Sequence, residues 1–470
     1  MTTATRRARI AVHKFSSCDG CQLAFLNLGE PLLTLAETVD ILHFAEAGPI
    51  DDEAEVDIAF VEGSVATSQD AVRLRGIRQR SRYLVTIGAC ATAGGIQALR
   101  NLHDADAWVS GVYAQPEHID LLADSTPIAE SVKVDLELWG CPVSGEQVLG
   151  ATKALLAGHL PRVDHSAVCM ECKRQQAVCV MVAQGRPCMG PVTSTGCGAI
   201  CPRWQRDCYA CYGPAVQANV SALATHLADT GMPADEVARR LLFINGHAEP
   251  FRSRRPGPAG TGHQASGQRG GAGMSHDTRT GEIHVPILAR VEGEGALDIR
   301  IEAGRIEALT LRIFEPPRLF EKLLEGRSTQ DVIDSVARIC GICPVAYQMS
   351  AVTAIESILG VTPSPWVEAM RRVMYCGEWL QSHSLHIHLL AAPDFLGYDS
   401  APAMARDYPE EVRRGLRLQG LGNEIIRHLR RPLGAPGRHL PGRLLPRPGC
   451  RRPCRPCVSA WRQASRRPAR

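Results

Sequence analysis

Cysteine is the residue type whose spacing in this sequence could do chemistry. The 470 residues contain 18 cysteines, and the first two form the motif Cys18-x-x-Cys21. Two later cysteines, Cys90 and Cys141, each follow a short apolar run. Four thiolates brought to one point can hold a four-iron cluster. The alternative for Cys90 and Cys141 is burial as ordinary core residues, which is common for free cysteine.

Short apolar runs alternate with segments of helical spacing in the first 160 residues. We expect strands at residues 9–14, 39–44, 56–61, 83–88 and 133–138. Helical spacing covers residues 22–36, 68–80 and 144–157. This alternation predicts an α/β domain with a doubly wound parallel sheet, in which functional groups collect at the carboxyl ends of the strands. The four cysteines follow such strand ends, so the sheet is expected to bring four thiols to one edge.

A second group of cysteines lies between residues 168 and 214, where few apolar residues are available to build a core. Its members are Cys169, Cys172, Cys179, Cys188, Cys197, Cys201, Cys208 and Cys211. Bound metal would have to supply much of the folding free energy of this segment. Eight ligands match two [4Fe–4S] clusters or two four-cysteine zinc sites. Cys201-Pro202 and the Gly-rich surroundings are ferredoxin-like and favour iron–sulfur, but the spacing does not assign each cysteine to a site.

The rest of the chain reads as a linker and a second domain. Residues 251–275 are rich in Gly, Pro, Ser and Arg and lack periodicity, which indicates a flexible linker. Residues 276–429 open with the alternation of a β-meander and continue with helical spacing at 318–324, 330–336 and 366–391, so we expect an α+β fragment. Within it, the turn Cys340-Gly-Ile-Cys343 could direct two sulfurs at one metal or form a redox disulfide.

The net charge of +3 has a local origin. From Arg427 onward the chain has 13 Arg and no Asp or Glu, so the preceding residues carry a net charge of −10. Nucleic-acid binding is therefore not predicted. Residues 430–470 read either as a disordered basic tail or as out-of-frame translation of a GC-rich gene. Neither a long apolar run nor a cleavable leader is recognisable, so we expect a cytoplasmic protein without a membrane span.

Taken together, CDGCQ, GACA, GCP, the eight-cysteine block and RICGICP resemble a [NiFe] hydrogenase whose small and large subunits are joined. Residues 1–251 resemble the small, or delta, subunit of the sulfhydrogenase type. The resemblance implies a flavodoxin-like domain over 1–160, similar to the 20 kDa subunit of NADH:quinone oxidoreductase, and a two-cluster ferredoxin-like region over 161–250. Residues 282–429 resemble the amino-terminal part of the large, or alpha, subunit.

The resemblance also implies cofactors and roles. Cys18, Cys21, Cys90 and Cys141 would hold a proximal [4Fe–4S] cluster, and the eight-cysteine block would hold two more. Cys340 and Cys343 would supply two thiolates to a Ni–Fe centre. Glu292 matches a glutamate that passes protons from a nickel-bound thiolate, a role that suits a carboxyl whose pKa is raised towards neutrality by desolvation. Glu321 matches a magnesium-site residue, with a solvated helix glutamate as the alternative.

The expected function is therefore H2 cleavage, with electrons passed through three clusters to flavin- and NAD(P)-binding partner subunits. The second large-subunit motif, Asp-Pro-Cys-x-x-Cys, does not occur in this sequence, and Tyr347 stands where many relatives have His. We expect the chain alone to be inactive and a complete large subunit to be a further partner. The alternative is an iron–sulfur electron-transfer module without hydrogen chemistry, but RICGICP and ARVEGEG favour the hydrogenase.

Overall fold

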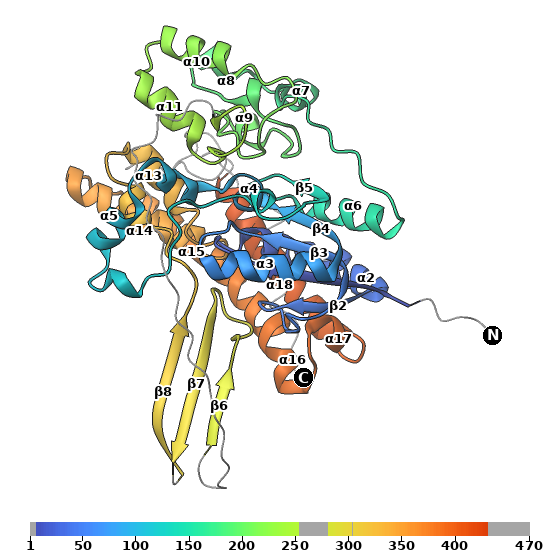
Figure 1. Ribbon diagram of the computed structural model, residues 1–470. Coiled ribbons are helices and arrows are strands. Elements are labelled where there is room, and N and C mark those ends of the chain that lie inside the picture. The colour runs from blue at the N-terminus through green and yellow to red at the C-terminus, as the bar shows by residue number, and fades with distance from the viewer. Residues whose placement is uncertain (1–5, 253–280, 303, 431–470) are drawn as a thin grey trace.

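The computed structural model describes residues 6–252, 281–302 and 304–430. A five-stranded sheet with its helices forms the centre, the cysteine-rich segment lies on one side of it, and a three-stranded ribbon and a group of long helices belong to the C-terminal half (Figure 1). Most of the predicted linker and of the Arg/Pro-rich tail, including Cys450, Cys454 and Cys457, lies outside the described residues.

The predicted doubly wound sheet is confirmed. Its strands are β1 Ala8–Lys14, β2 Val39–Phe44, β3 Val56–Glu62, β4 Ser81–Ile87 and β5 Leu136–Leu138. They pair in parallel in the order β2-β1-β3-β4-β5, which is the flavodoxin-like order. Strand β5 is shorter than the run at 133–138 predicted, since residues before Leu136 do not join the ladder.

The helices that connect these strands follow the predicted spacing with one exception. They are α1 Gly20–Leu26, α2 Glu30–Thr38, α3 Ser68–Arg80, α4 Gly88–Ala93, α5 Ala105–Val112 and α6 Gly145–Leu156, with 3-10 turns at Ile96–Leu102, Pro116–His118 and Ile128–Glu130. A single helix over 22–36 is wrong. The helix is interrupted at Gly29, whose φ is +68°. A second helix begins at Glu30, with Pro31 in its first turn, where proline is favoured.

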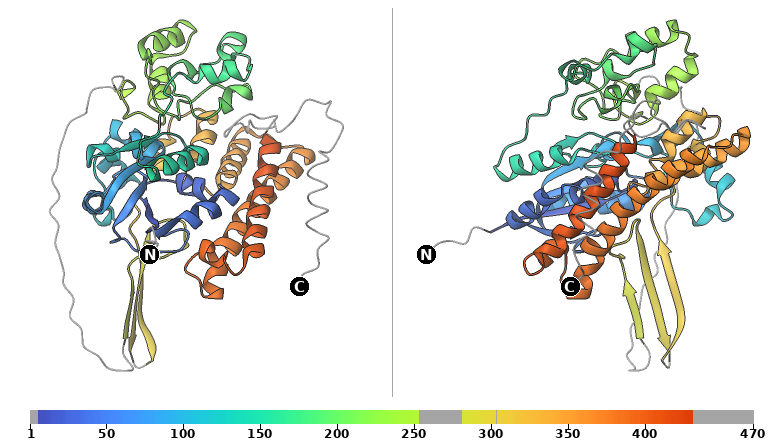
Figure 2. Two further views of the ribbon diagram at one scale, coloured as in Figure 1. Left: turned by 90° about the vertical axis from the view of Figure 1, so that its right-hand side faces the viewer. Right: turned by 180° about the vertical axis from the view of Figure 1, so that it is seen from behind.

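The cysteine-rich segment is built from short pieces. These are α7 Cys169–Arg174, α8 Val180–Gln184, a 3-10 turn Gly190–Val192 and α9 Ile200–Arg203. The predicted helix pair follows as α10 Val220–Asp229 and α11 Ala234–Leu242. Both views in Figure 2 show this segment as a separate layer next to the sheet domain.

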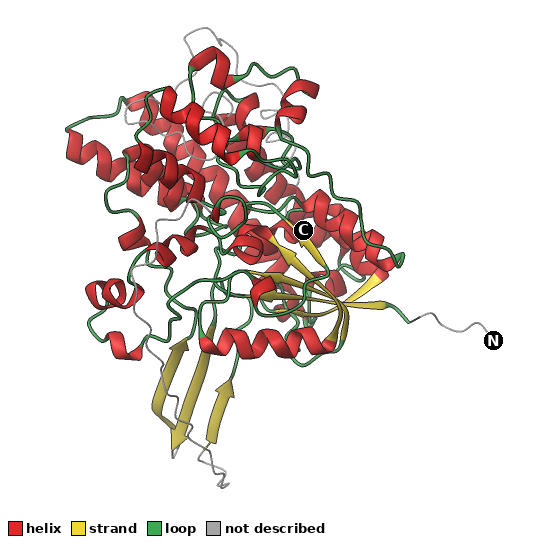
Figure 3. Cartoon of the chain, turned by 45° about the horizontal axis from the view of Figure 1, so that its top comes forward, coloured by secondary structure: helices red, strands yellow, loops and turns green. Residues whose placement is uncertain are grey.

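The C-terminal half begins with the predicted β-meander. Strands β6 Gly281–Val285, β7 Gly295–Glu302 and β8 Arg305–Ile313 pair antiparallel and extend away from the body (Figure 3). The helices are α12 Phe320–Leu323, α13 Thr329–Val336, α14 Pro344–Leu359, α15 Pro365–Leu385, a π-helical turn His386–Ala391, α16 Ala392–Leu396, α17 Ala401–Met404 and α18 Pro409–Arg430. None of the described helices is both long and apolar enough to cross a membrane.

The two halves share one hydrophobic core. Phe25 and Phe60 of the sheet domain belong to the same buried cluster as Leu385, Leu389 and Leu416 of the C-terminal helices. Burying such side chains contributes about 1.5–3 kcal/mol each. The C-terminal half is therefore packed onto the sheet domain through a shared apolar core, which places the cysteines of the two halves relative to one another.

Candidate metal centres

The fold brings the four predicted thiols to one edge of the sheet. Cys18 and Cys21 lie where β1 leads into α1, Cys90 lies in α4 directly after β4, and Cys141 follows β5. All four are free cysteines. Three loops that are far apart in the sequence meet here because the carboxyl ends of parallel strands share an edge. This placement agrees with the predicted proximal site.

The thiols of these cysteines lie near enough to influence one another electrostatically. Burial raises the pKa of the Cys18 thiol well above its ordinary value, and the neighbouring Cys141 and Cys90 add to that rise. Burial, followed by Cys141, raises the pKa of Cys90 to about 12. Four thiolates so close together and so poorly solvated would repel one another without a cation. A bound iron–sulfur cluster supplies that positive charge, so the donor set fits the group that the sequence predicts.

Glycines leave room beside the sulfurs. Gly95 has a φ of +66°, and a Cβ placed there would lie 2.5 Å from the Cys90 sulfur. Gly88, with a φ of +86°, would press a Cβ into the Cys21 sulfur. A side chain at either position would fill the space around the thiols. This cradle is the second indication that the sheet edge is built to hold a bulky inorganic group.

The eight-cysteine block divides into two neighbouring sets along the chain. In the first set, burial raises the pKa of the Cys169 thiol, and the nearby thiols of Cys188 and Cys179 add to that rise. Burial likewise raises the pKa of Cys172, together with Cys169 and Cys188. The sulfurs of Cys188 and Cys169 also lie 3.4 and 3.5 Å from the position of a Cβ on Gly190. We call Cys169, Cys172, Cys179 and Cys188 the outer set.

The remaining four form the middle set, namely Cys197, Cys201, Cys208 and Cys211. The thiol of Cys211 has Cys201, Cys197 and then Cys141 of the sheet edge as its neighbours. Cys172 of the outer set in turn neighbours Cys197. Cys208 has Cys188 of the outer set as its first cysteine neighbour, ahead of Cys211 and Cys201, and its N–H donates a hydrogen bond to the Cys188 sulfur at 3.3 Å. The two sets therefore adjoin, and Cys211 brings the middle set next to the sheet edge.

A third group lies at the start of α14. The ligand atoms of Glu292, Cys340 and Cys343 lie within 4.8 Å of one another. Cys340 and Cys343 are joined as a disulfide with a Cα–Cα distance of 5.6 Å. Because a metal ligand must be a thiolate, metal binding by this pair requires its reduced form. Although Glu292 as a whole residue is exposed, burial of its carboxyl and the nearby Asp19 raise its pKa to about 7.

The Cys340 turn rests directly on the Cys18 turn. The Gly341 N–H donates a hydrogen bond of 2.6 Å to the Cys18 carbonyl oxygen. A Cβ on Gly341 would lie 2.5 Å from the Gly20 Cα, so the two turns approach backbone to backbone. Only glycine permits this distance. The third group is thus held against the sheet-edge thiols.

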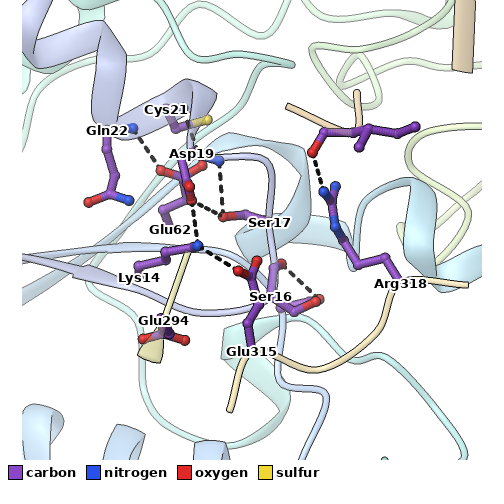
Figure 4. A network of polar contacts seen from close by, with 12 residues as sticks. Lys14, Ser16, Ser17, Asp19, Cys21, Gln22, Glu62, Glu294, Glu315 and Arg318 are labelled. Carbon is purple, nitrogen blue, oxygen red and sulfur yellow. Dashed lines mark hydrogen bonds and ion pairs between the residues drawn. The ribbon is translucent and has the colours of Figure 1, made fainter. Parts of the chain in front are cut away.

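Charged groups behind these turns were not singled out in the sequence (Figure 4). Lys14 Nζ lies 3.0 Å from Asp19 and 3.2 Å from Glu315, and both acids raise the Lys14 pKa although burial opposes them. Glu62 accepts hydrogen bonds from the Cys21 and Gln22 N–H groups at 3.2 and 2.7 Å. In the sequence, Glu62 could have been noticed as a carboxylate at the end of a mainly apolar strand.

The magnesium-site role of Glu321 stays a prediction. Glu321 is exposed on α12, and it is not among the described residues whose ligand atoms group with Cys340. Glu321 lies near Tyr113. Burial raises the pKa of Tyr113, and the Glu321 carboxylate adds to that rise. The magnesium-site role receives no geometric support from the described residues, and the solvated glutamate remains the alternative.

Two family models match the chain. Residues 18–155 match the family described as NADH ubiquinone oxidoreductase, 20 Kd subunit. Residues 318–413 match the family described as nickel-dependent hydrogenase. The fold and the thiol sets together with these matches define a hydrogenase-type protein in which a small-subunit-like part precedes a large-subunit-like part.

The chain belongs to the family of hydrogenase small subunits that includes the sulfhydrogenase delta subunits. It is 34% identical over 233 residues to sulfhydrogenase 2 subunit delta of Pyrococcus furiosus, which covers 50% of this chain and 97% of that protein. It is 42% identical over 143 residues to sulfhydrogenase 2 subunit alpha of the same organism, covering 30% of this chain but only 35% of that protein. The chain thus spans about a third of the alpha relative.

A solved structure, an NAD+-reducing [NiFe]-hydrogenase in the H2-reduced state, contains a chain that is 33% identical to this protein. The match covers 33% of this chain and 95% of the other, with a TM-score of 0.31.

Proposed function

We propose that this chain relays electrons between a Ni–Fe site that cleaves H2 and a flavin- and NAD(P)-binding module, through three [4Fe–4S] clusters. The observation that carries the proposal is the spatial series of three four-cysteine sets, with the Cys340 turn in backbone contact with the first. The relation to sulfhydrogenase subunits supports the hydrogenase class.

The domain division follows from this proposal. Residues 1–160 hold the proximal cluster, residues 161–250 hold the two further clusters, and residues 251–275 link them to the large-subunit-like part at 276–429. The sheet-edge, middle and outer cysteine sets hold one cluster each as thiolates. Each cluster, when bound, accepts and gives up one electron at a time.

Glu292 is the proposed proton carrier next to Cys340 and Cys343. Its carboxyl oxygen and both sulfurs fall within 4.8 Å, which is close enough for direct or single-water proton transfer. In its reduced form the pair would hold the Ni–Fe centre, which supplies the H2-cleaving chemistry. The carboxyl then accepts a proton from one sulfur and passes it towards the polar groups around Asp19 and Lys14.

The partners are proposed on the same grounds. The Cys340 group offers two sulfurs and one carboxylate among the described residues. We expect a complete large subunit to accompany the chain, together with the flavin- and NAD(P)-binding subunits that would receive the electrons. The relatives that support this expectation are themselves named as subunits.

Metal analysis of the anaerobically purified chain tests the proposal. We expect about 12 iron and 12 labile sulfide per chain, and three paramagnetic centres after dithionite reduction. Zinc without sulfide would overturn the cluster assignment. Three clusters that never accept electrons from H2, even with a complete large subunit present, would favour an electron-transfer module without hydrogen chemistry.

A further inference from the structure

An arginine of the large-subunit-like part lies between two of the cysteine sets. Arg338 follows α13 and stands two residues before Cys340. Its guanidinium stacks on Phe243, which packs in one cluster with Cys141 of the sheet edge and Cys211 of the middle set, and both thiols act on the Arg338 charge. The same guanidinium also acts on Cys201 of the middle set. One cation therefore faces thiols of both sets.

The surrounding structure holds this side chain in place. Its Cζ lies 5.5 Å from the centre of the Phe243 ring, which comes directly after α11. Arg318 donates hydrogen bonds to the carbonyl oxygens of Arg338, at 2.7 Å, and of Ile339. Ile339 packs in the same cluster as Cys141 and Cys211. Both the backbone and the guanidinium plane of Arg338 are thus positioned.

The positive charge of Arg338 is not cancelled locally. Arg338 hydrogen-bonds the Asp334 carbonyl oxygen, and the Asp334 carboxylate is its nearest acid. That carboxylate also pairs with Arg206, at 2.7 Å. One negative charge is shared by two guanidinium groups, and arginine keeps its proton under all ordinary conditions. The Asp334 carboxylate therefore neutralises the Arg338 charge only in part.

We propose that Arg338 raises the reduction potentials of the sheet-edge and middle clusters together, so that the large-subunit-like part tunes the electron path of the small-subunit-like part. A cation next to the ligand sulfurs stabilises the reduced cluster, which carries one more negative charge than the oxidised one. One electron leaves the first cluster and enters the second, and no bond forms or breaks. Arg338 is a positioning and tuning residue, and the inference rests on the proposed function.

The test is an EPR-monitored redox titration of the full chain with dithionite, after iron and sulfide have been measured. For Arg338→Gln we expect the sheet-edge and middle clusters to become harder to reduce, with about a tenfold higher ratio of oxidised to reduced cluster at a fixed potential. That factor corresponds to about 59 mV for a one-electron couple. The outer cluster should be unchanged.

Arg327→Gln is the matched control. Arg327 stacks on the same Phe243 ring at 5.8 Å, but its charged neighbours are Asp331 and Arg239 and not cysteines. Its removal should leave all three potentials unchanged. Arg338→Lys keeps the charge without the planar fork and should shift the two potentials by less than Arg338→Gln does.

The possible results separate the inference from the proposed function. Full iron and sulfide with identical potentials in the two Gln variants would overturn the role of Arg338 and leave the relay intact. A wild-type chain without iron and sulfide would overturn both. If Arg338→Gln loses clusters, Asp334→Asn is the deciding variant. Removing that carboxylate strengthens the local positive field, so both potentials should rise, and an unchanged or lowered pair would contradict the inference.

Discussion

The carboxyl edge of the sheet and the Cys340 turn hold their cysteines in opposite ways. At the sheet edge, four thiols arrive from three loops and remain free. In the Cys340 turn, two cysteines three residues apart close on each other as a disulfide. Cys18 and Cys21 have the same Cys-x-x-Cys spacing as Cys340 and Cys343, yet they remain free beside Cys90 and Cys141, so the spacing alone does not decide the chemical state. A site assembled from distant loops is therefore specified by the fold, whereas a local Cys-x-x-Cys keeps two chemical outcomes open.

The largest expected effect is the loss of one cluster from the sheet edge. Cys90→Ser removes one of four thiolates whose positions are set by the fold, and we expect about four of 12 iron atoms to be lost. Iron and sulfide analysis measures this. Cys376→Ser, an exposed cysteine on α15, is the control and should retain all iron. Full iron content in Cys90→Ser would show that the sheet edge does not hold a cluster.

The next prediction concerns proton transfer at the Cys340 turn. In a preparation that exchanges H2 with D2O, Glu292→Gln should slow the exchange about 100-fold or more, since a positioned acid–base group contributes about that much. Metal content should stay the same. Glu307→Gln, an exposed glutamate on β8, serves as the control. Exchange at the original rate in Glu292→Gln would remove this carboxyl from the proton path.

A smaller effect should appear where the two regions touch. Gly341→Ala forces a Cβ to within 2.5 Å of the Gly20 Cα and 2.7 Å of the Cys18 carbonyl oxygen. We expect the free energy of unfolding to fall by about 1–3 kcal/mol, the usual cost of overpacking. Gly150→Ala in α6 meets no atom within 4 Å and should stabilise slightly. Urea unfolding compares the two, and equal stabilities would contradict the backbone contact.

The last effect is acid sensitivity of the sheet domain. His13 and His43 stack at 4.5 Å between ring centres, and burial lowers the pKa of both, that of His43 to about 3. Since the folded state binds fewer protons than the unfolded state, the free energy of unfolding should fall as the pH drops from about 6.5 towards 3. Each histidine can contribute at most about 1.4 kcal/mol per pH unit, which is the slope for one proton.

Replacing one partner tests this origin of the acid sensitivity. His43→Gln removes one titrating group, so urea midpoints measured between pH 6.5 and 4 should vary less with pH than those of the wild type. His284→Gln, an exposed histidine on β6, should keep the wild-type dependence. Identical pH profiles for all three proteins would place the acid sensitivity elsewhere in the molecule.

Much of the fold was predictable because its signals are local. The segment 68–80 was predicted as a helix and forms α3 over the same residues, because Thr67 and Asp70 make a capping box ahead of it. The alternation of apolar runs with helical spacing predicted the parallel sheet, and the position of cysteines after strand ends predicted their convergence. The broken helix at Gly29 was missed although Gly29 and Pro31 are both residues that interrupt helices.

By itself, the sequence determined the thiol inventory, the secondary-structure order and the family to which the motifs point. These depend on residue types, short spacings and periodicity, all of which are readable along the chain. Only the tertiary structure decided which cysteines of the eight-cysteine block are neighbours. It also decided that Gly341 packs on Gly20 and that Arg338 lies near Cys141. Such contacts join residues tens to hundreds of positions apart, and their energies depend on burial and direction, which no local pattern contains.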